Sequence, residues 1–349
     1  MLVTYLRSSS YTGYTFCQQQ YFLSYTLGLR PDETNKWSVP GSQKKADKGT
    51  LVHKALELLA RGKLAEQEGA LGFTDEETGR HFPRTPCVEE AVAAAWAHYT
   101  QSLSHWEWTD RDHVDCLLWA QEALTAAGGR VSPLTRTVLW PEKRFDLTFE
   151  ADWARYDYAL PDGTRLAGRL ALKGTLDLVC RTEHGDCVEL IDWKTGARKD
   201  WATGKPKDFK SLMNDAQLRL YHYALCRLCP WAKEVFITIV YLRDGGAFSL
   251  PFSRKMLPET EALIKERFAA IRDNARPELL SDQPAERWKC ERLCAFGQND
   301  WPGSQKTACQ FIADEVVQLG VDRVTLKYGR AAALTQYGTG GGRSEGGEG

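Results

Sequence analysis

Two carboxylates and a lysine stand at strand-like spacing near the middle of the chain. Asp192 and Lys194 are two residues apart in the segment 189–195, so on a strand their side chains leave the same face. Asp177 lies in the earlier apolar segment 174–179, where a carboxylate is unfavourable unless it is paired or binds a cation. We predict that both segments are strands joined by a hairpin turn, which brings the three side chains together.

Such a group of side chains suits a hard divalent ion such as Mg²⁺ or Mn²⁺. The ion neutralises charge on a phosphodiester, lowers the pKa of a bound water and orients in-line attack. Lys194 would lie near that water, where its ammonium group could orient the nucleophile or stabilise transition-state charge, without a firm general-base role. The alternative is a structural Asp–Lys ion pair at a strand end, a common arrangement that contributes little.

Further segments place this pair in a longer pattern. The ordered set is Gly49-Thr-Leu-Val-His53, Gly174-Thr-Leu-Asp177, Asp192-Trp-Lys194-Thr-Gly196 and Gln217-Leu-Arg-Leu-Tyr221. Across residues 7–310 the chain resembles the PD-(D/E)XK nuclease superfamily, in particular its RecB-type branch. That branch includes nuclease domains of bacterial recombination helicases and the small exonucleases of CRISPR adaptation. Asp-x-Lys alone is a weak motif, whereas the ordered set is specific.

The resemblance implies a role for each residue of the set. It gives the divalent ion four ligands: His53, Asp177, Asp192 and the main-chain carbonyl of Trp193. Lys194 would act on the water and the phosphate. Gln217 and Tyr221 are four apart and share a helical face, from which they would hold Lys194 or contact the DNA backbone. The plainer alternatives are a surface or core histidine at position 53 and ordinary packing for Gln217 and Tyr221.

Four of the ten cysteines form a second candidate site. Cys17 stands alone before an aromatic segment, and Cys290, Cys294 and Cys309 gather near the C-terminal end. The resemblance implies a 4Fe-4S cluster that links the two ends, with zinc or four unrelated thiols as alternatives. The spacing departs from the family pattern because Cys309 follows only after a longer loop. Disulfides are not expected in a cytosolic chain, and we predict that three other cysteines are buried: Cys180, Cys226 and Cys229.

The remaining patterns predict an α/β fold, with a restriction-endonuclease-like core of mixed sheet flanked by helices. Helices are predicted over 17–27, 49–61, 86–101, 111–127, 209–228 and 258–272, and strands over 135–140, 144–149, 165–180, 187–193 and 235–242. Residues 41–48 are polar and predicted to be mobile. We expect one nuclease domain over 1–337, with a helical elaboration at about 50–130, a catalytic core at about 135–280 and a cysteine segment at about 288–312. The Gly-rich residues 338–349 should be a disordered tail without a Walker A motif.

The formal net charge of the 349 residues is −1, so any attraction to nucleic acid must be local. Five basic residues close to the Asp-x-Lys segment could provide it, or could simply be a solvated loop: Arg198, Lys199, Lys205, Lys207 and Lys210. No apolar run approaches the roughly 20 residues that span a bilayer, and the start of the chain lacks a signal-peptide pattern. We therefore expect a cytoplasmic protein without a membrane partner.

These observations favour a metal-dependent DNA exonuclease or end-processing nuclease that acts on single strands or strand ends. Three aromatic residues could stack bases or simply pack in the core: Trp193, Trp201 and Tyr221. Because no motor motif is present, the enzyme would stand alone or borrow a helicase or recombination partner. Recombination, repair, CRISPR adaptation and phage DNA metabolism all remain open. The alternatives are a non-cleaving module that binds DNA or a partner, and a small-molecule metalloenzyme, which would lack the usual His-rich zinc ligands.

Overall fold

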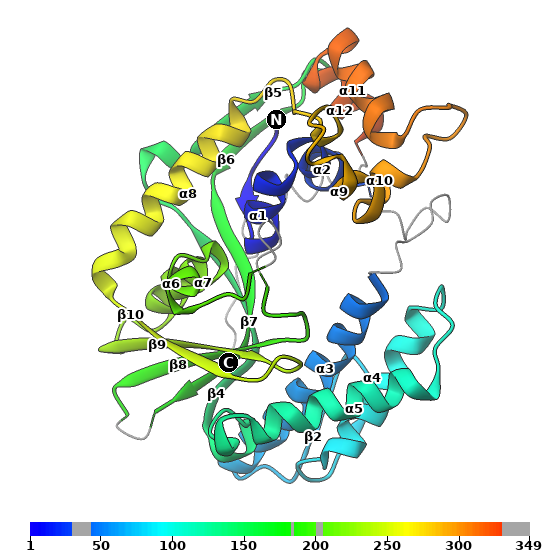
Figure 1. The fold of residues 1–349 in the computed structure, drawn as a ribbon. Coiled ribbons are helices and arrows are strands. Elements are labelled where there is room, and N and C mark those ends of the chain that lie inside the picture. The colour runs from blue at the N-terminus through cyan, green and yellow to red at the C-terminus, as the bar shows by residue number, and fades with distance from the viewer. Residues whose placement is uncertain (30–42, 183–184, 200–204, 330–349) are drawn as a thin grey trace, which may run out of the picture. The chain divides into compact units, whose positions relative to one another are not determined.

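The computed structural model describes residues 1–29, 43–182, 185–199 and 205–329 (Figure 1). Contacts within the chain divide it into two compact units. The first, which we call the sheet unit, comprises residues 41–145 and 174–260. The second, the cysteine unit, comprises residues 1–40, 146–173 and 261–349. Among the described residues, no helix is both long and apolar enough to cross a membrane.

A mixed β-sheet forms the centre of the fold, in the order β1-β7-β8-β9-β10 with β4 beside β7. Its strands are β1 (Tyr5–Leu6), β4 (Thr137–Thr148), β7 (Ala171–Arg181), β8 (Cys187–Lys194), β9 (Glu234–Tyr241) and β10 (Ala247–Phe252). β7 and β8 form the predicted antiparallel hairpin, whereas β8 and β9 are parallel. The parallel pair explains why β9 is an almost continuous apolar run, since both faces of such strands are buried.

Three helices pack together on one side of the sheet unit (Figure 1). They are α3 (Gln43–Gln67), α4 (Val88–Ser102) and α5 (Asp110–Thr125), and the short hairpin of β2 (Phe73–Thr74) and β3 (His81–Phe82) joins α3 to α4. Small residues such as Ala91 and Ala120 are fully buried where these helices meet. The same apolar core includes Ile191 and Trp193 of β8, so this face of the sheet is covered by the helices. The predicted α/β class with a central mixed sheet flanked by helices is confirmed.

Four predictions about local structure were wrong. The segments 135–140 and 144–149, predicted as two strands, form the single strand β4, whereas the predicted strand 165–180 is divided into β6 (Arg165–Arg169) and β7. Residues 41–48 were expected to be mobile, but residues 43–48 form the first turns of α3, because Lys44 and Lys48 form ion pairs with the nearby helix α5. Residues 41 and 42 lie outside the described residues. The expected single helix 209–228 is two helices, α6 (Phe209–Met213) and α7 (Ala216–Leu228). The chain restarts there because Asp215 accepts a hydrogen bond from the Gln217 amide and caps the second helix. α7 packs on β9.

The cysteine unit is built mainly from short helices. Its elements are α1 (Ser8–Phe16), α2 (Gln18–Tyr21) with a π-helical turn (Phe22–Thr26), β5 (Arg155–Ala159), β6 (Arg165–Arg169), most of α8 (Leu257–Arg272), α9 (Arg287–Arg292), α10 (Ala295–Gln298), α11 (Ala308–Leu319) and α12 (Val321–Tyr328). The sequence predicted the helix after Cys17 and α8 but neither α1 nor α9 to α12. The predicted tail 338–349 lies outside the described residues.

Candidate metal-dependent active site

The β7–β8 hairpin places the two predicted carboxylates side by side. Leu178 pairs with Ile191, so the next step of the antiparallel register sets Asp177 opposite Asp192. The backbone N–H of Trp193 donates to Asp177 Oδ2 at 3.0 Å. This bond, together with the strand register, holds the Asp177 carboxylate at the end of the hairpin. The sequence expectation that these two segments meet through a turn is therefore confirmed.

Asp192 is buried beside Lys194. Its side chain is 1% exposed, and Oδ2 lies 2.7 Å from Lys194 Nζ. Oδ1 has no hydrogen-bond partner in the described part of the chain. Burial raises the pKa of Asp192 to about 6, because the nearby Asp177 carboxylate reinforces this effect and Lys194 only partly opposes it. A carboxylate left partly unsatisfied in this way offers a free oxygen to a cation.

Helix α3 brings His53 to the same place. Gly49, one turn earlier, touches the residue that follows β8: a β-carbon at position 49 would lie only 2.5 Å from Thr195 Oγ1. This close approach sets His53 Nδ1 at 3.3 Å from Asp177 Oδ2. Burial alone would lower the pKa of His53, but the Asp177 and Glu142 carboxylates outweigh it and raise the pKa to about 9. The imidazole thus has an acidic side chain on each of two sides.

Glu142, on β4, is a member of the site that sequence reasoning missed. Ligand atoms of His53, Glu142 and Asp177 all lie within 4.8 Å of one another, and this is the one such set among the described residues. Burial and the Asp177 charge raise the pKa of Glu142 to about 8, although His53 opposes them. In the sequence, Pro141 and Glu142 lie between two predicted strands, and the structure joins these strands into β4. No other feature of the sequence points to Glu142. Asp192 is not a member of this compact set, and its carboxylate contacts Lys194 instead.

Gln217 and Tyr221 face the site from α7. Gln217 Nε2 donates to the Tyr221 hydroxyl at 2.9 Å, as expected for residues one helical turn apart. Tyr221 is buried near Asp192 and Lys194, and burial together with the Asp192 charge raises the pKa of its hydroxyl to about 12. The Tyr221 hydroxyl is therefore neutral at neutral pH, and it lies near Lys194.

The assembled side chains fit a divalent metal ion. Three carboxylates and one imidazole converge, and the Lys194 ammonium group lies 2.7 Å from Asp192 Oδ2. Oxygen ligands with one nitrogen suit Mg²⁺ and Mn²⁺. Asp192 Oδ1, which has no hydrogen-bond partner among the described residues, is the specific observation in favour of an ion. A bound cation would compensate the negative charge of this buried carboxylate, which is otherwise unfavourable.

The other predicted nucleic-acid contacts have mixed outcomes. Trp193 is 1% exposed and packs in the core, so its ring is not available to stack on a base. Trp201 lies outside the described residues. Of the basic residues, Lys207 is paired with Asp215 at 2.7 Å, and Arg198 packs on the Phe248 ring. Three others are exposed, namely Lys199, Lys205 and Lys210.

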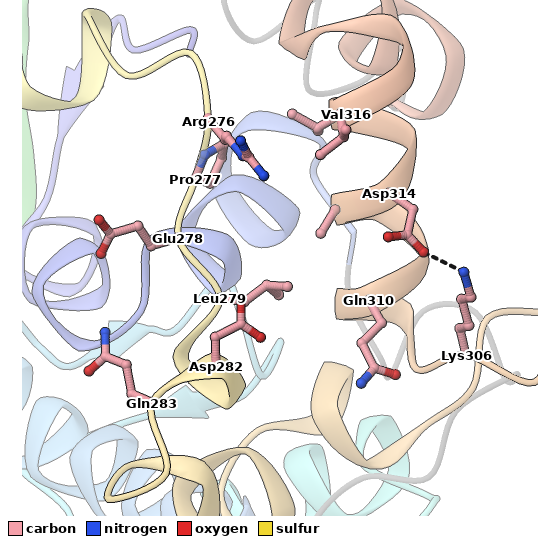
Figure 2. A pocket seen from close by; sticks show the side chains of 12 residues that line it. Arg276, Pro277, Glu278, Leu279, Asp282, Gln283, Lys306, Gln310, Asp314 and Val316 are labelled. Carbon is pink, nitrogen blue, oxygen red and sulfur yellow. Dashed lines mark hydrogen bonds and ion pairs between the residues drawn. The ribbon is translucent and has the colours of Figure 1, made fainter.

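A groove of about 860 Å³ opens beside the site, lined by His53, Glu142 and neighbouring charged residues. Another hollow, of about 930 Å³, lies in the cysteine unit between α11 and residues 276–283 (Figure 2). Its labelled side chains include the Lys306–Asp314 ion pair, but they form no compact set of metal-binding groups. The groove in the sheet unit is therefore the better candidate for a substrate path.

The four predicted cluster cysteines come together in the cysteine unit, around a cavity of about 380 Å³. They come from four places: Cys17 precedes α2, Cys290 lies on α9, Cys294 precedes α10 and Cys309 lies on α11. Hydrogen bonds from the Cys309 thiol and from the amides of Gly297 and Phe296 lower the pKa of Cys294 to about 7. Burial raises the pKa of Cys17, and the Gln20 amide, which donates to Cys17 Sγ at 3.4 Å, only partly opposes this effect. Amides aimed at sulfur favour thiolates, which are the metal-binding form. Cys180, Cys226 and Cys229 are buried, as predicted.

Comparison with known proteins identifies the class. A model of the PD-(D/E)XK nuclease superfamily matches residues 8–298, and the chain belongs to this superfamily. The mixed sheet flanked by helices is consistent with its restriction-endonuclease-like fold. A search of curated proteins finds no match. A solved structure titled "Crystal structure of SSO0001" is similar over 69% of this chain and 82% of its own, with 13% identity and a TM-score of 0.26.

Proposed function

We propose that the chain is a metal-dependent DNA nuclease of the RecB-type branch. It would act as an exonuclease or end-processing enzyme on single-stranded DNA or strand ends. The buried Asp192 carboxylate supports this most directly, because it stands beside Asp177 and leaves Oδ1 without a hydrogen-bond partner among the described residues. Two neighbouring buried carboxylates are unfavourable unless a cation compensates their charge. Because the chain belongs to a nuclease superfamily, we propose that this cation assists phosphodiester cleavage.

Four groups would hold Mg²⁺ or Mn²⁺: His53, Asp177, Asp192 and the main-chain carbonyl of Trp193. When bound, the ion supplies charge neutralisation at the scissile phosphate and lowers the pKa of a water molecule. His53 must bind through a neutral ring nitrogen, so it gives up its proton on binding. Asp177 is oriented in advance, since the Trp193 amide fixes Oδ2.

Lys194 would act as an ammonium ion. Burial would lower its pKa, but the Asp192 and Asp177 carboxylates and the nearby Tyr221 outweigh this and raise it, so the side chain stays protonated. Its N–H groups can donate to a phosphoryl oxygen or to the attacking water and stabilise developing negative charge. Tyr221 and Gln217 would keep Lys194 in place through the buried hydroxyl at its side.

The substrate assignment relies on local positive charge. The chain as a whole carries a formal net charge of −1, so phosphate binding must come from exposed side chains such as Lys199 and Lys210. Binding of this kind is independent of base sequence and weakens with salt. It suits an enzyme that processes DNA ends, in recombination, repair, CRISPR adaptation or phage DNA metabolism, alone or with a helicase or recombination partner.

The test is digestion of oligonucleotides labelled at the 5′ or the 3′ end, single-stranded and duplex, with an RNA arm for comparison. Wild-type protein should degrade DNA in Mg²⁺ or Mn²⁺ and stop in EDTA. Asp192→Asn and Lys194→Met should each lower the rate by roughly 10²-fold or more. Lys233→Met is the matched control, because Lys233 is 78% exposed and pairs with Asp186 in the same unit.

Each result of this assay has a clear meaning. Equal digestion by wild type and both site variants would show a contaminating nuclease and reject the site. Metal-independent DNA binding without product in any divalent ion would favour a non-cleaving module. Products that accumulate from one labelled end establish polarity, whereas internal fragments would replace the exonuclease assignment with an endonuclease.

We also propose that Cys17, Cys290, Cys294 and Cys309 hold a 4Fe-4S cluster. Four thiolates on one zinc ion would lie about 3.8 Å apart, given zinc–sulfur bonds of about 2.3 Å. Cys294 and Cys309 lie within hydrogen-bond distance of each other, but among the described residues no three of the sulfurs form a compact set. The cavity of about 380 Å³ between the four segments suits a larger cluster, in which each thiolate binds a different iron. Such a cluster would fasten α2 to the C-terminal helices.

Anaerobic purification tests this assignment. Brown protein with broad visible absorbance and about four irons per chain is expected. Cys294→Ser should lose the colour, whereas Cys187→Ser, in the sheet unit, should keep it. Colourless protein with one zinc per chain would replace the cluster with zinc, and protein without metal would reject both.

A further inference from the structure

Trp140 and Lys143 of β4 lie in the groove that His53 and Glu142 also line. Both side chains are half-buried, and Lys143 Nζ lies over the Trp140 ring, 5.3 Å from its centre. Residues three apart on a regular strand leave opposite faces. The contact is possible because Glu142, between them, has a backbone φ of 44°, which interrupts the alternation of β4. An aromatic ring and a cation are thus brought together beside a candidate metal ligand.

Two consecutive cations in this part of β4 are available to a ligand. Arg144 follows Lys143 and is exposed, and neither side chain forms an ion pair among the residues that the structure describes. Lysines elsewhere in the sheet unit are paired, such as Lys207 with Asp215 at 2.7 Å. Cations that no carboxylate neutralises attract phosphate groups. The β4 side of the groove therefore suits a phosphodiester chain.

The acidic side chains on the opposite side of the groove belong to α3 and to the segment after β2. Lys54 Nζ lies within 3.0 Å of three of these carboxylates, those of Glu57, Asp75 and Glu77, and partly compensates their charge. Glu68 and Glu76 are exposed and line the same groove. Because these carboxylates repel phosphates, a nucleic-acid strand is expected to follow β4 rather than α3.

We propose that Trp140, Lys143 and Arg144 form a subsite that holds an unpaired nucleotide of the DNA strand beside the metal centre. This inference rests on the proposed nuclease function and specifies the kind of strand that the enzyme takes. The base would stack on the Trp140 indole, and the adjoining phosphates would contact the two cations. Trp140 precedes Glu142 by two residues, at most about 7 Å along the chain. The stacked nucleotide would therefore be next to the metal ligands.

Stacking on Trp140 requires a base that is not inside a duplex. A base within a duplex already stacks on its neighbours, whereas a base in a single strand or at a frayed end can reach a protein ring. Every base has a π-face, so the subsite would accept any base sequence. Trp140 thus provides a physical reason for a preference for single strands or strand ends, which the metal ligands alone do not provide.

The experiment compares binding of the full-length chain to single-stranded oligothymidine and to a GC-rich blunt duplex. Binding is followed by fluorescence anisotropy in EDTA at low salt. Trp140→Ala should weaken single-strand binding by about 5- to 150-fold, the range for loss of one stacked base, and should change duplex binding little. Trp140→Phe should recover most of the loss. The matched control is Trp231→Ala, because Trp231 is 44% exposed, has Arg181 over its ring at 4.8 Å and does not line the groove.

Salt dependence tests the two cations separately from the ring. Each phosphate contact with a single strand contributes about 0.7 to the slope of log affinity against log salt concentration. The double variant Lys143→Met/Arg144→Met should therefore reduce the slope by about 1.4, whereas Trp140→Ala should leave it unchanged. Equal slopes for wild type and the double variant would exclude both cations from the subsite.

The outcomes separate this inference from the proposed function. Unchanged binding in Trp140→Ala, or an equal loss for single strand and duplex, overturns the subsite even if DNA is still digested. Selective loss of single-strand binding in a protein that digests no nucleic acid would support the subsite and favour a non-cleaving module. Urea unfolding checks that each variant folds. If Trp140→Ala does not, Trp140→Leu takes its place, since leucine keeps apolar bulk without an aromatic face and should show the same loss.

Discussion

Gly49 on α3 and Thr195 after β8 are in such close contact that a β-carbon on residue 49 would lie 2.5 Å from Thr195 Oγ1. This contact connects the helix that carries His53 to the strand that carries Asp192 and Lys194. Since His53 is one helical turn beyond Gly49, a shift of the helix start would move the imidazole away from Asp177. The glycine is therefore needed for its small size, not for an unusual backbone conformation.

Gly49→Ala should destabilise the protein by about 1–3 kcal/mol, because the added methyl group overpacks a tight contact. It should also weaken Mn²⁺ binding. The double variant Gly49→Ala/Thr195→Ala removes Oγ1 and should recover much of both losses. Urea unfolding and calorimetric Mn²⁺ titration measure the two effects. If the two substitutions are simply additive, the contact does not position His53.

A buried neutral histidine gives the sheet unit an acid sensitivity. His222 on α7 is fully buried, stacks on Phe252 and has no hydrogen-bond partner for Nδ1 in the described chain. Burial, reinforced by the charges of Arg254 and Arg219, lowers the pKa of His222 to about 4. Below pH 6.5 the unfolded chain therefore binds a proton that the folded chain excludes, so stability falls as the pH drops from about 6.5 towards 4.

His222→Gln should flatten this part of the pH profile. The shift corresponds to about 2–3 kcal/mol at most between the two ends of the window. Urea unfolding of wild type and variant at several pH values gives the comparison, in which other titrating groups cancel. Parallel curves for the two proteins between pH 6.5 and 4 would show that His222 is protonated in the folded state.

The hairpin and most of the helices of the sheet unit could be predicted from the sequence because their signals are local. Alternation around Asp177 and Asp192 defined the two strands, and the apolar spacing of α3 placed His53 on a helix. The break between α6 and α7 was also visible, since Asp215 is a good N-cap residue. The helical apolar period, which continues across 209–228, masks this signal.

Glu142 and the start of α3 could not be predicted in the same way. Glu142 reaches the site because its backbone has a positive φ within β4 and because the fold places it close to His53. No local sequence pattern indicates either feature. The start of α3 depends on ion pairs from Lys44 and Lys48 to residues of α5, more than 60 positions along the chain. These long-range ion pairs stabilise a helix over 43–48, although the polar sequence of this segment predicts mobility.

Gly297 limits the space around the cysteine cavity. A β-carbon there would lie 2.6 Å from the Cys290 carbonyl oxygen, which is backbone and cannot turn away. Gly297→Ala should therefore displace Cys290 and lower metal content and visible absorbance by at least half. Gly13→Ala, on α1 of the same unit, is the control, because its nearest contact is an ordinary 3.5 Å from the Tyr25 ring. Unchanged metal in Gly297→Ala would place Cys290 outside the ligand set.

Lys54 follows His53 on α3 and is a buried cation with three acidic partners. Its Nζ lies 2.7 Å from Asp75, 2.9 Å from Glu77 and 3.0 Å from Glu57, and its side chain is 2% exposed. Burial would raise the pKa of Asp75, but Lys54 and Thr78 outweigh it and lower the pKa. The Asp75 contribution to stability is thus present above its unfolded pKa of about 4 and lost as pH falls further.

Lys54→Met should cost about 3–5 kcal/mol at neutral pH, because removing one partner of a buried ion pair leaves uncompensated charge. The deficit should shrink as the pH falls towards 4, where the stranded carboxylates take up protons and lose their charge. Lys63→Met on the same helix is the control, since Lys63 lies 3.7 Å from an exposed Glu66 and should contribute little. Denaturant unfolding of the three proteins across this pH range measures the effect. A deficit that stays constant with pH would mean that lost packing of the lysine stem, not stranded charge, causes the instability.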